Sequence, residues 1–357
     1  MYLGPRRTRV IVSSILVISL LAAACSTNSA STSSSSVGTT KSLTNFTSAV
    51  FQSEVYLPDF VAKDKGFYAA HGINMNFVTP ASGAAAAQLM LAGQVQGWST
   101  DPQIALTAAA KGEDIRLAGL EVPTQIYWLL VAKNGNWPSN SASFNQKMAA
   151  LEGKTVGVSG IGAGTDHALL AGLNAAGLPL NSVNRVGIGQ QTAAIGQLQA
   201  GSISAFVSFS LAGNAIIAQQ TGARVLVAFG GNDVPSSVRN IPGLGMAVQG
   251  SFAQQHPKVI ADWRAADQEA IDWIKKNPAQ AAVVLNKYVY NGVQLALAKQ
   301  VIPEFLSGVF SSIPPGLKMS RTSFDLGIKA LKEIGAIPST AALTYENAVI
   351  PSARASS

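Results

Sequence analysis

The sequence is poor in the residues that metal sites, disulfides and nucleic-acid surfaces require. Of its 357 residues, one is cysteine, three are histidine and only 12% are charged. A single cysteine excludes both a disulfide within this chain and a metal site with several cysteine ligands. The formal net charge is +7, but Arg6, Arg7 and Arg9 lie in a segment that we expect to be removed, which leaves 22 basic against 18 acidic residues. This balance, with no basic cluster, gives little support for nucleic-acid binding.

The first 45 residues are typical of an exported and anchored protein. Arg6 to Arg9 form a basic stretch, Val10 to Leu21 an apolar stretch too short to span a bilayer comfortably, and Ala22 to Ala24 a small-residue cleavage site. We therefore expect residues 1–24 to be a signal peptide. Leu-Ala-Ala-Ala-Cys resembles a bacterial lipobox, with Cys25 as the lipidated N-terminus, although its leucine lies one position further back than usual. Simple cleavage after Ala24 is the alternative.

The Ser/Thr-rich segment that follows, Ser26 to Thr44, is too polar to offset its ordering entropy, so residues 25–45 are expected to be a lipidated tether. Folded structure is expected from near Phe46. With 48% hydrophobic residues, the remaining chain can fill the cores of two domains. Strand and helix patterns alternate, which predicts an α/β fold with largely parallel sheets. The expected strands are 47–51, 73–78, 94–98, 115–120, 127–132, 155–158, 183–187, 203–207, 224–228 and 243–248; the expected helices are 57–70, 84–91, one from Pro102, and 257–276, 278–290, 295–306 and 320–334.

The pattern of a glycine-rich stretch from Lys154 to His167 predicts a strand, then an open loop, then a helix. Ser159, Gly160, Gly162 and Gly164 allow the backbone to approach a ligand, and Thr165 or Asp166 is placed to cap the helix. A phosphate-binding P-loop would need a Gly-Lys-Ser/Thr ending, and a dinucleotide fold would need a carboxylate after the next strand; both are missing. Two interpretations stay open: half of a binding site for a small polar molecule, or a tight turn without a ligand.

Five short motifs give the chain its resemblance to a known family. They are Ala62 to Ile73 (AKDKGFYAAHGI), Leu91 to Gly93 (LAG), Ala110 to Gly112 (AKG), Leu151 to Gly157 (LEGKTVG) and Leu198 to Ala205 (LQAGSISA). In this order they resemble the solute-binding proteins of ABC importers, in the nitrate, sulfonate and taurine-binding group that also contains proteins for thiamine-precursor pyrimidines. The resemblance covers nearly everything from Phe46 to Ile350.

The resemblance implies a periplasmic-binding-protein fold of type II, with a ligand held between two lobes. Residues 46–130 and 245–357 would form lobe 1, residues 131–244 lobe 2, and strands 127–132 and 243–248 would cross between them as the hinge. The implied function is capture of a small polar molecule by hinge closure and its delivery to the permease and ATPase subunits of an importer. The implied receptor is a monomer, needs no cofactor or metal, and is held by Cys25 to the outer face of the cell membrane or is free in the periplasm.

Ligand-binding residues are expected in the loops that follow the strands, where open α/β sheets place ligands. These expected residues are Ser53, Glu54, Tyr56, Ser82, Gly83, Trp98, Ser99, Thr100, Asp101, Tyr127, Ser159, Gly160, Gly162, Gly164, Thr165, Gln190, Gln191 and Ser208. The cleft loops contain Glu54, Asp101 and Asp166 but neither lysine nor arginine. That charge balance favours a neutral or amine-bearing molecule such as a heterocycle over a sulfonate or nitrate.

Two other functions stay open. A pyrimidine-synthase branch shares this fold, but its chemistry depends on histidines and cofactor-binding residues. Of the three histidines here, only His167 is placed where it could face the cleft, and a lone histidine on a helix is more often structural. No Ser-His-Asp order, Cys-His pair or metal cluster is present to indicate catalysis. A ligand sensor without a transport role is the second alternative.

Overall fold

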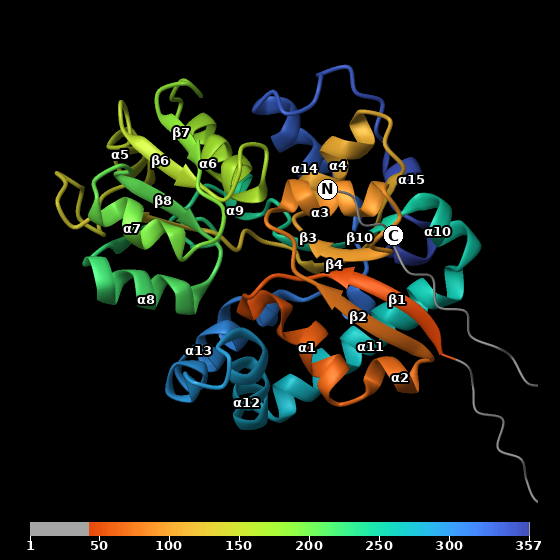
Figure 1. The fold of residues 1–357 in the computed structure, drawn as a ribbon. Helices are drawn as coiled ribbons and strands as arrows, with labels where there is room; N and C mark the ends of the chain where they lie inside the picture. Colours follow the sequence, from red (N-terminus) through yellow and green to blue (C-terminus); the bar gives the residue numbers. More distant parts are fainter. Residues whose placement is uncertain (1–42, 357) are drawn as a thin grey trace, which may run out of the picture. The chain divides into compact units, whose positions relative to one another are not determined.

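Residues 43–356 are described by the computed structural model. The predicted signal peptide, the lipidation site Cys25 and almost all of the predicted tether lie outside these residues. Two five-stranded sheets organise the described part, and each is flanked by helices (Figure 1). Within residues 43–356, no helix is both long and apolar enough to cross a bilayer.

The first sheet has the strand order β2-β1-β3-β10-β4. Its strands are β1 (Thr44–Ala49), β2 (Ile73–Val78), β3 (Gly97–Thr100), β4 (Ile115–Val122) and β10 (Leu244–Gln249). Strand β1 pairs in parallel with β2 and β3, whereas β10 runs antiparallel between β3 and β4. We call this sheet and the helices packed on it the first lobe.

The second sheet repeats this arrangement, in the order β7-β6-β8-β5-β9. Its strands are β5 (Trp128–Val131), β6 (Thr155–Val158), β7 (Asn184–Gly187), β8 (Ala205–Ser208) and β9 (Arg224–Ala228). Strand β6 pairs in parallel with β7 and β8, and β5 runs antiparallel between β8 and β9. Each sheet is therefore mixed, with one antiparallel strand in the next-to-last position. We call this sheet and its helices the second lobe.

The chain passes between the two sheets twice, from Val122 to Trp128 and from Ala228 back to Leu244. These passages run beside each other: the Gln125 amide donates to the Arg239 carbonyl at 2.9 Å, and the Gly243 amide donates to the Val122 carbonyl at 2.9 Å. The predicted crossing segments 127–132 and 243–248 mostly form β5 and β10, the antiparallel strands that continue each passage into a sheet.

The helices of the two lobes have the following bounds. In the first lobe they are α1 (Leu57–Asp64), α2 (Phe67–Ala70), α3 (Gly83–Leu91), α4 (Pro102–Ala110), α10 (Gly250–Gln255), α11 (Pro257–Lys276), α12 (Pro278–Val289), α13 (Leu295–Gly308), α14 (Arg321–Glu333) and α15 (Tyr345–Ala348). In the second they are α5 (Phe144–Ala149), α6 (Gly164–Ala175), α7 (Ala193–Gln199), α8 (Leu211–Thr221) and α9 (Ser236–Arg239). Short 3₁₀ turns are η1 (Glu54–Tyr56), η2 (Phe310–Ser312), η3 (Pro315–Leu317) and η4 (Pro351–Ala353).

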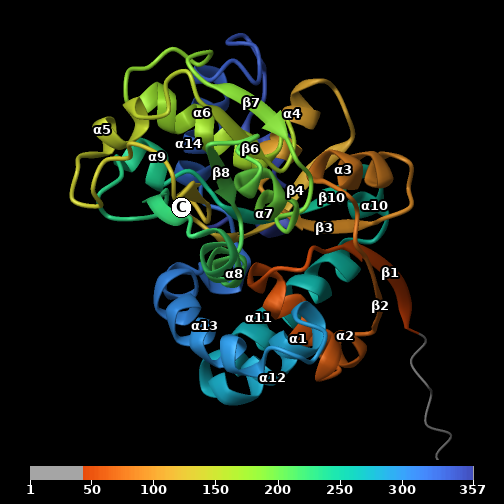
Figure 2. The ribbon, with the colours of Figure 1, turned by 60° about the vertical axis from the view of Figure 1, so that its left-hand side comes forward.

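Helix α11 joins the C-terminal helices to the first lobe. Its apolar residues recur at three-to-four spacing, and Trp263, Ala270 and Ile274 are fully buried, as a core-facing stripe requires. The Trp263 ring lies 5.0 Å from the ring of Phe46 in β1, centroid to centroid. Helices α11 and α12 also pack on α1 (Figure 2), as predicted for this C-terminal set, whereas α13 contacts α8 and α14 contacts α6 in the second lobe as well.

Three local predictions are corrected by the structure. The first strand begins at Thr44, inside the predicted tether, and ends at Ala49 rather than residue 51. The predicted helix 57–70 is two helices, because Gly66 takes a left-handed conformation (φ 76°) that ends α1 and redirects the chain into α2.

Candidate functional site

A cavity of about 70 Å³ lies between the two lobes. Its walls come from the strand ends and helix N-termini of both sheets and from the passages between them, and it has room for a few water molecules or a small molecule. The lining residues are Phe51, Val55, Tyr56, Ala81, Ser82, Gly83, Trp98, Thr100, Asp101, Ile104, Ile126, Tyr127 and Leu244 from the first lobe and the passages, and Ser159, Ala163, Gly164, Thr165, Gly189, Gln190 and Phe209 from the second lobe.

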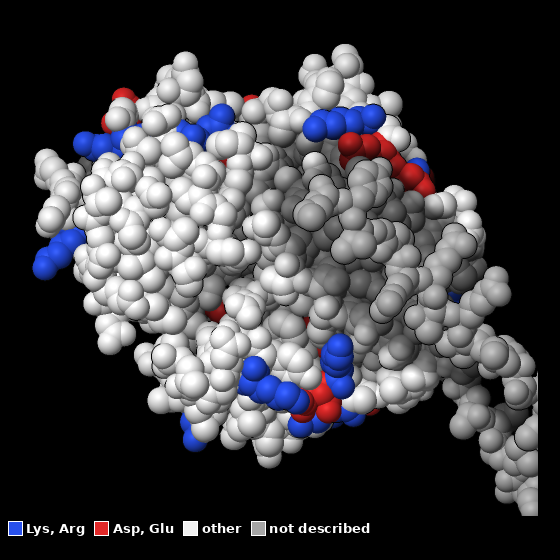
Figure 3. Space-filling model, viewed as in Figure 1, with Lys and Arg blue, Asp and Glu red and all other residues white. Residues whose placement is uncertain are grey.

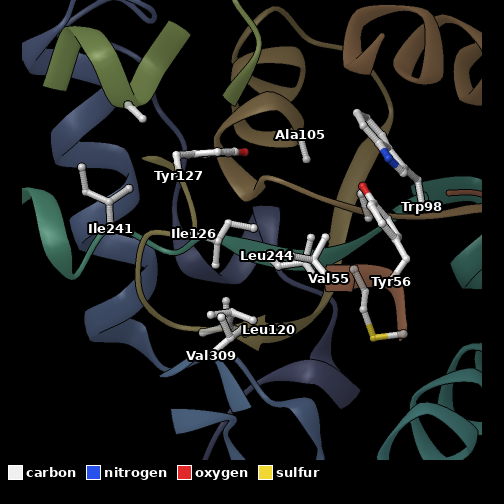
Figure 4. Close-up of a cluster of buried hydrophobic side chains, with 14 of the residues drawn as sticks. Val55, Tyr56, Trp98, Ala105, Leu120, Ile126, Tyr127, Ile241, Leu244 and Val309 are labelled. Atoms are coloured by element: carbon white, nitrogen blue, oxygen red, sulfur yellow. The ribbon is translucent and has the colours of Figure 1, made fainter. Parts of the chain in front are cut away.

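Aromatic rings form much of the cavity wall. Trp98 is 1% exposed, and its ring lies against Gly83 at the start of α3, where an added Cβ would meet it at 3.6 Å. Figure 4 shows the hydroxyl of Tyr56 beside the Trp98 indole, and Tyr127 extending from the passage towards α4. The indole nitrogen of Trp98 and the hydroxyl of Thr100 are buried without a hydrogen-bond partner among the described residues. The wall thus consists largely of flat apolar surfaces, and these two polar atoms are not exposed on it.

Asp101 provides the carboxylate of the cavity wall. It is the N-cap of α4: one carboxylate oxygen accepts from the Gln103 amide at 2.7 Å, and the other accepts from the Tyr127 hydroxyl at 3.1 Å. Burial raises the pKa of Asp101 to about 7, against the lowering effect of these two hydrogen bonds. The lining contains no lysine, arginine or histidine. On the face shown in Figure 3, charged side chains are few and lie mostly towards the margins.

The glycine-rich stretch brings α6 against the first lobe. A Cβ added at Gly164 would lie 2.1 Å from the Tyr127 hydroxyl and 2.3 Å from a carboxylate oxygen of Asp101, so glycine is required for this approach. Neither predicted capping residue caps α6, whose N-cap is Ala163. Thr165 instead accepts from the Ser159 amide at 2.9 Å, and Asp166 accepts from the Gly162 amide at 2.8 Å and pairs with Arg185 at 2.7 Å.

Comparison with known protein families shows to which family the chain belongs. The family model described as "NMT1/THI5 like" matches residues 54–281, which include nearly every segment that lines the cavity. The chain belongs to the NMT1/THI5 like family. No curated protein matches it. The relationship inferred from the sequence motifs, to the solute-binding proteins of this group, is confirmed.

Solved structures similar to this NMT1/THI5-like chain share its fold. The periplasmic aliphatic sulphonate binding protein SsuA from Escherichia coli has a TM-score of 0.63 at 19% identity, over 84% of this chain and 96% of its own. The periplasmic nitrate-binding protein NrtA from Synechocystis PCC 6803 has a TM-score of 0.65 at 13% identity, over 84% of this chain and 83% of its own. The desulfurization enzyme DSZB has a TM-score of 0.57 at 15% identity, over 84% and 94%. The predicted two-lobed α/β fold is confirmed, and it occurs in both binding proteins and an enzyme.

Eleven of the eighteen residues expected to bind a ligand line the cavity. They are Tyr56, Ser82, Gly83, Trp98, Thr100, Asp101, Tyr127, Ser159, Gly164, Thr165 and Gln190. The strand-end rule works here because β3 and β6 both end at the cavity. Seven others lie outside the lining: Ser53, Glu54, Ser99, Gly160, Gly162, Gln191 and Ser208.

The seven residues outside the lining have other contacts in the structure. The Ser53 hydroxyl donates to the Phe209 carbonyl at 3.0 Å, and Glu54 contacts the start of α8. Gln191 holds the loop after β8 by donating to the Ser210 carbonyl at 3.2 Å, and Ser208 bonds Asn214. Gly160 and Gly162 shape the loop before α6 without lining the cavity, and Ser99 faces the buried carboxyl of Asp59.

His167 does not line the ligand cavity. It lies on α6 beside a separate, much smaller cavity lined also by Gln103, Gln125 and Leu331. Burial lowers the pKa of His167 to about 4, so the ring is neutral at physiological pH. His167 therefore lies beside α14 rather than at the ligand cavity, in the structural position that is more usual for a lone histidine on a helix.

Several apolar residues that line the ligand cavity were not predicted from the sequence. Phe51, Ile126 and Leu244 read as ordinary core residues of strands or of their ends, since hydrophobicity alone does not separate a cavity wall from a core. No sequence signal identified them. Ile126 and Leu244 come from the two passages, so the cavity wall includes the segments that join the lobes.

Proposed function

We propose that this protein is an exported solute-binding receptor of an ABC importer, which encloses a small molecule between its lobes and delivers it to the membrane permease. The observation that carries the proposal is a cavity lined from both lobes, at the strand ends. Family membership and the binding proteins among the structural relatives support it. We also propose that the two lobes move as two bodies, with the first expected boundary, at residue 130, shifted to the passage before Trp128 because β5 belongs to the second sheet. The receptor is proposed to be a monomer held by a lipid on Cys25.

The proposed ligand is a small neutral or amine-bearing heteroaromatic molecule. Aromatic walls favour a flat ring, which gains both burial and stacking. A sulfonate or nitrate would meet the Asp101 carboxyl with no basic residue in the lining to compensate, whereas an amine would gain from the ionised form. Asp101, which lines the cavity, is the ionisable group that would orient such a ring.

Capture is proposed to work by hinge closure. Ligand binds one lobe, and rotation about the two passages brings α6 and the loop after β8 onto it. Contacts made only in the closed form shift the equilibrium; a complete shift requires about 5 kcal/mol of differential binding, which several hydrogen bonds and an aromatic stack supply. The importer would then recognise the closed form.

The test is native mass spectrometry and thermal shift on the purified protein, as isolated and after unfolding and refolding. The panel contains alkanesulfonates, nitrate, amines and pyrimidines. We expect a saturable rise in melting temperature with an amine or pyrimidine, abolished by Phe209→Ala in the cavity wall and kept by Phe67→Ala, a similarly half-buried phenylalanine outside it. A response to sulfonate or nitrate alone would overturn the ligand class. Absence of binding, with turnover of a panel compound, would replace the receptor by an enzyme, as in the relative DSZB.

A further inference from the structure

Glu54 joins the two lobes outside the ligand cavity. It begins the 3₁₀ turn η1 in the first lobe and is 0% exposed. Its carboxylate reaches across to the N-terminus of α8 in the second lobe, where the Ser210 hydroxyl donates to Oε2 at 2.8 Å and the Leu211 amide donates to Oε1. These two hydrogen bonds join residues that are 156 and 157 positions apart in the sequence.

The start of α8 is suited to receive this carboxylate. The helix has eleven residues and no acidic side chain of its own in its first turn. Its free amide groups and dipole attract an anion. Within residues 43–356, no lysine, arginine or histidine forms an ion pair with Glu54, so the helix end is the positive partner that the structure provides.

The Glu54 side chain is shielded from solvent. Burial raises its pKa, and hydrogen bonds from Ser210, Leu211 and Ala212 oppose this rise by favouring the charged form. The hydroxyl of Tyr290, at the end of α12, is buried without a partner among the described residues and lies within the electrostatic reach of Glu54. Low polarity around a paired carboxylate strengthens its interaction with the helix end.

Two neutral contacts cross between the lobes near Glu54. The Ser53 hydroxyl donates to the Phe209 carbonyl at 3.0 Å, and the Gln190 side chain donates to the Ala81 carbonyl at 3.3 Å. Neutral hydrogen bonds of this kind are weaker than one to an ionised group. Of these lobe-to-lobe contacts, the one from Glu54 is charged.

We propose that Glu54 is a positioning residue for closure, which acts as a tethered anion at the N-terminus of α8 and holds the lobes together whether or not a ligand is present. The inference rests on the proposed function, in which closure is the working motion of the receptor. Part of the closing energy then comes from the protein, so the ligand itself needs no anionic group to attract the second lobe. The start of α8 is also already occupied and is not offered to a ligand anion.

The experiment measures the distance between the lobes without ligand. Spin labels are placed on Lys111→Cys in the first lobe and Lys154→Cys in the second, both exposed positions, in a Cys25→Ser background, and the distance distribution is recorded by pulsed electron resonance. The unsubstituted pair is expected to give a distribution with a measurable closed component beside the open one. Glu54→Ala is expected to shift it to an open one, and Glu152→Ala, an exposed glutamate of the second lobe, is expected to leave it unchanged.

Chemical rescue separates a tethered anion from simple packing. Acetate supplies the atoms that Glu54→Ala removes, so added acetate is expected to restore the closed component in this variant and to leave the parent unchanged. Acetamide has nearly the same shape without the charge and is expected to restore much less. Glu54→Gln, which preserves the size of the side chain, is expected to open partially and guards against misfolding of the alanine variant.

Two results would contradict the proposed role of Glu54. A closed component as large as the parent's in both Glu54→Ala and Glu54→Gln, with circular dichroism unchanged from the parent, would overturn the proposal, as would equal rescue by acetate and acetamide. Because no ligand is used, failure of the ligand panel to bind leaves this test readable. If a ligand is identified, Glu54→Gln should weaken its affinity about tenfold, since the cost of closure then falls on the ligand.

Discussion

At Gly164 the backbone of α6 passes so near Asp101 and Tyr127 that a methyl group has no room. Gly164→Ala should therefore hold the lobes apart while leaving each lobe folded, because the backbone of this residue is ordinary helix. We expect ligand affinity to fall at least about tenfold, since contacts made only on closure are lost. Gly160→Ala is the matched control: its Cβ would meet only Ala163 Cβ, at 3.8 Å. Calorimetric titration of both variants checks this; equal affinities would contradict the tight approach.

The pKa of Asp101 makes the charge of the cavity depend on pH. With a pKa of about 7, the carboxyl is mostly neutral at pH 6 and mostly ionised at pH 8. An amine ligand should therefore bind about tenfold more tightly at pH 8 than at pH 6, whereas a neutral ligand should show little change. Asp101→Asn keeps an N-cap for α4 and should flatten the profile for the amine. Titrations at pH 6, 7 and 8 measure this, and a flat profile for an amine with the parent protein would refute it.

At the scale of elements, β3 packs closely against α11 because Gly97 has no side chain. A Cβ at Gly97 would lie 2.4 Å from the Phe46 ring and 2.8 Å from the Trp263 ring, both fully buried. Gly97→Ala should lower the free energy of unfolding by about 1–3 kcal/mol, the usual cost of overpacking. Urea denaturation measures it. Gly196→Ala in exposed α7, where a Cβ meets nothing within 4 Å, should instead raise stability by about 0.5–1 kcal/mol. If both substitutions changed the free energy of unfolding in the same direction, packing would not be what decides the change.

The elements also show what the sequence predicts and what it leaves out. Helix α11 was predicted within its observed bounds because periodic burial and Pro257 are local signals. The break at Gly66 was missed, since the apolar pattern continues across it and a left-handed glycine has no distinct pattern of its own. Glu54 was placed in a cleft loop by its position after a strand. Its partner at α8, however, depends on how the two lobes meet, which local patterns do not encode.

The same limit applies to the cavity. Trp98 and Asp101 were found because they follow a strand and open a helix, and strand ends meet at one edge of a parallel sheet. Phe51, Ile126 and Leu244 have the hydrophobicity of core residues, and they line the cavity because Phe51 follows β1 and the other two lie where the chain passes between the sheets. The helix of His167 was predicted, but the direction of this side chain was left open, because rotation about the helix axis follows from packing on α14.

At the scale of the whole molecule, the first lobe encloses a group of carboxyls that the ligand cavity does not use. Asp59, Glu121 and Asp267 are nearly fully buried, and the Tyr68 hydroxyl donates to Asp267 at 2.5 Å. Burial raises the pKa of Asp59 to about 7, and burial together with the neighbouring acids raises the pKa values of Glu121 and Asp267 well above their usual range. Tyr68 donates to Asp267, but both carboxyl oxygens of Glu121 have no hydrogen-bond partner among the described residues, so burial favours the neutral form of these acids.

Such carboxyls make the folded protein more stable in mild acid than at neutral pH. Between about pH 4 and pH 7 the folded chain keeps protons on Asp59, Asp101 and their neighbours that the unfolded chain releases, so stability falls as pH rises through this range. His167 works in the opposite direction, because its lowered pKa favours the folded state above pH 6.5, but it offsets only one proton. We expect the free energy of unfolding to be about 2–4 kcal/mol larger at pH 5.5 than at pH 7.5, measured by urea denaturation. Asp267→Asn, which keeps an acceptor for Tyr68, should make the profile shallower by removing one of the protons. A stability that rises from pH 5.5 to pH 7.5 would mean that these acids are ionised inside the folded lobe.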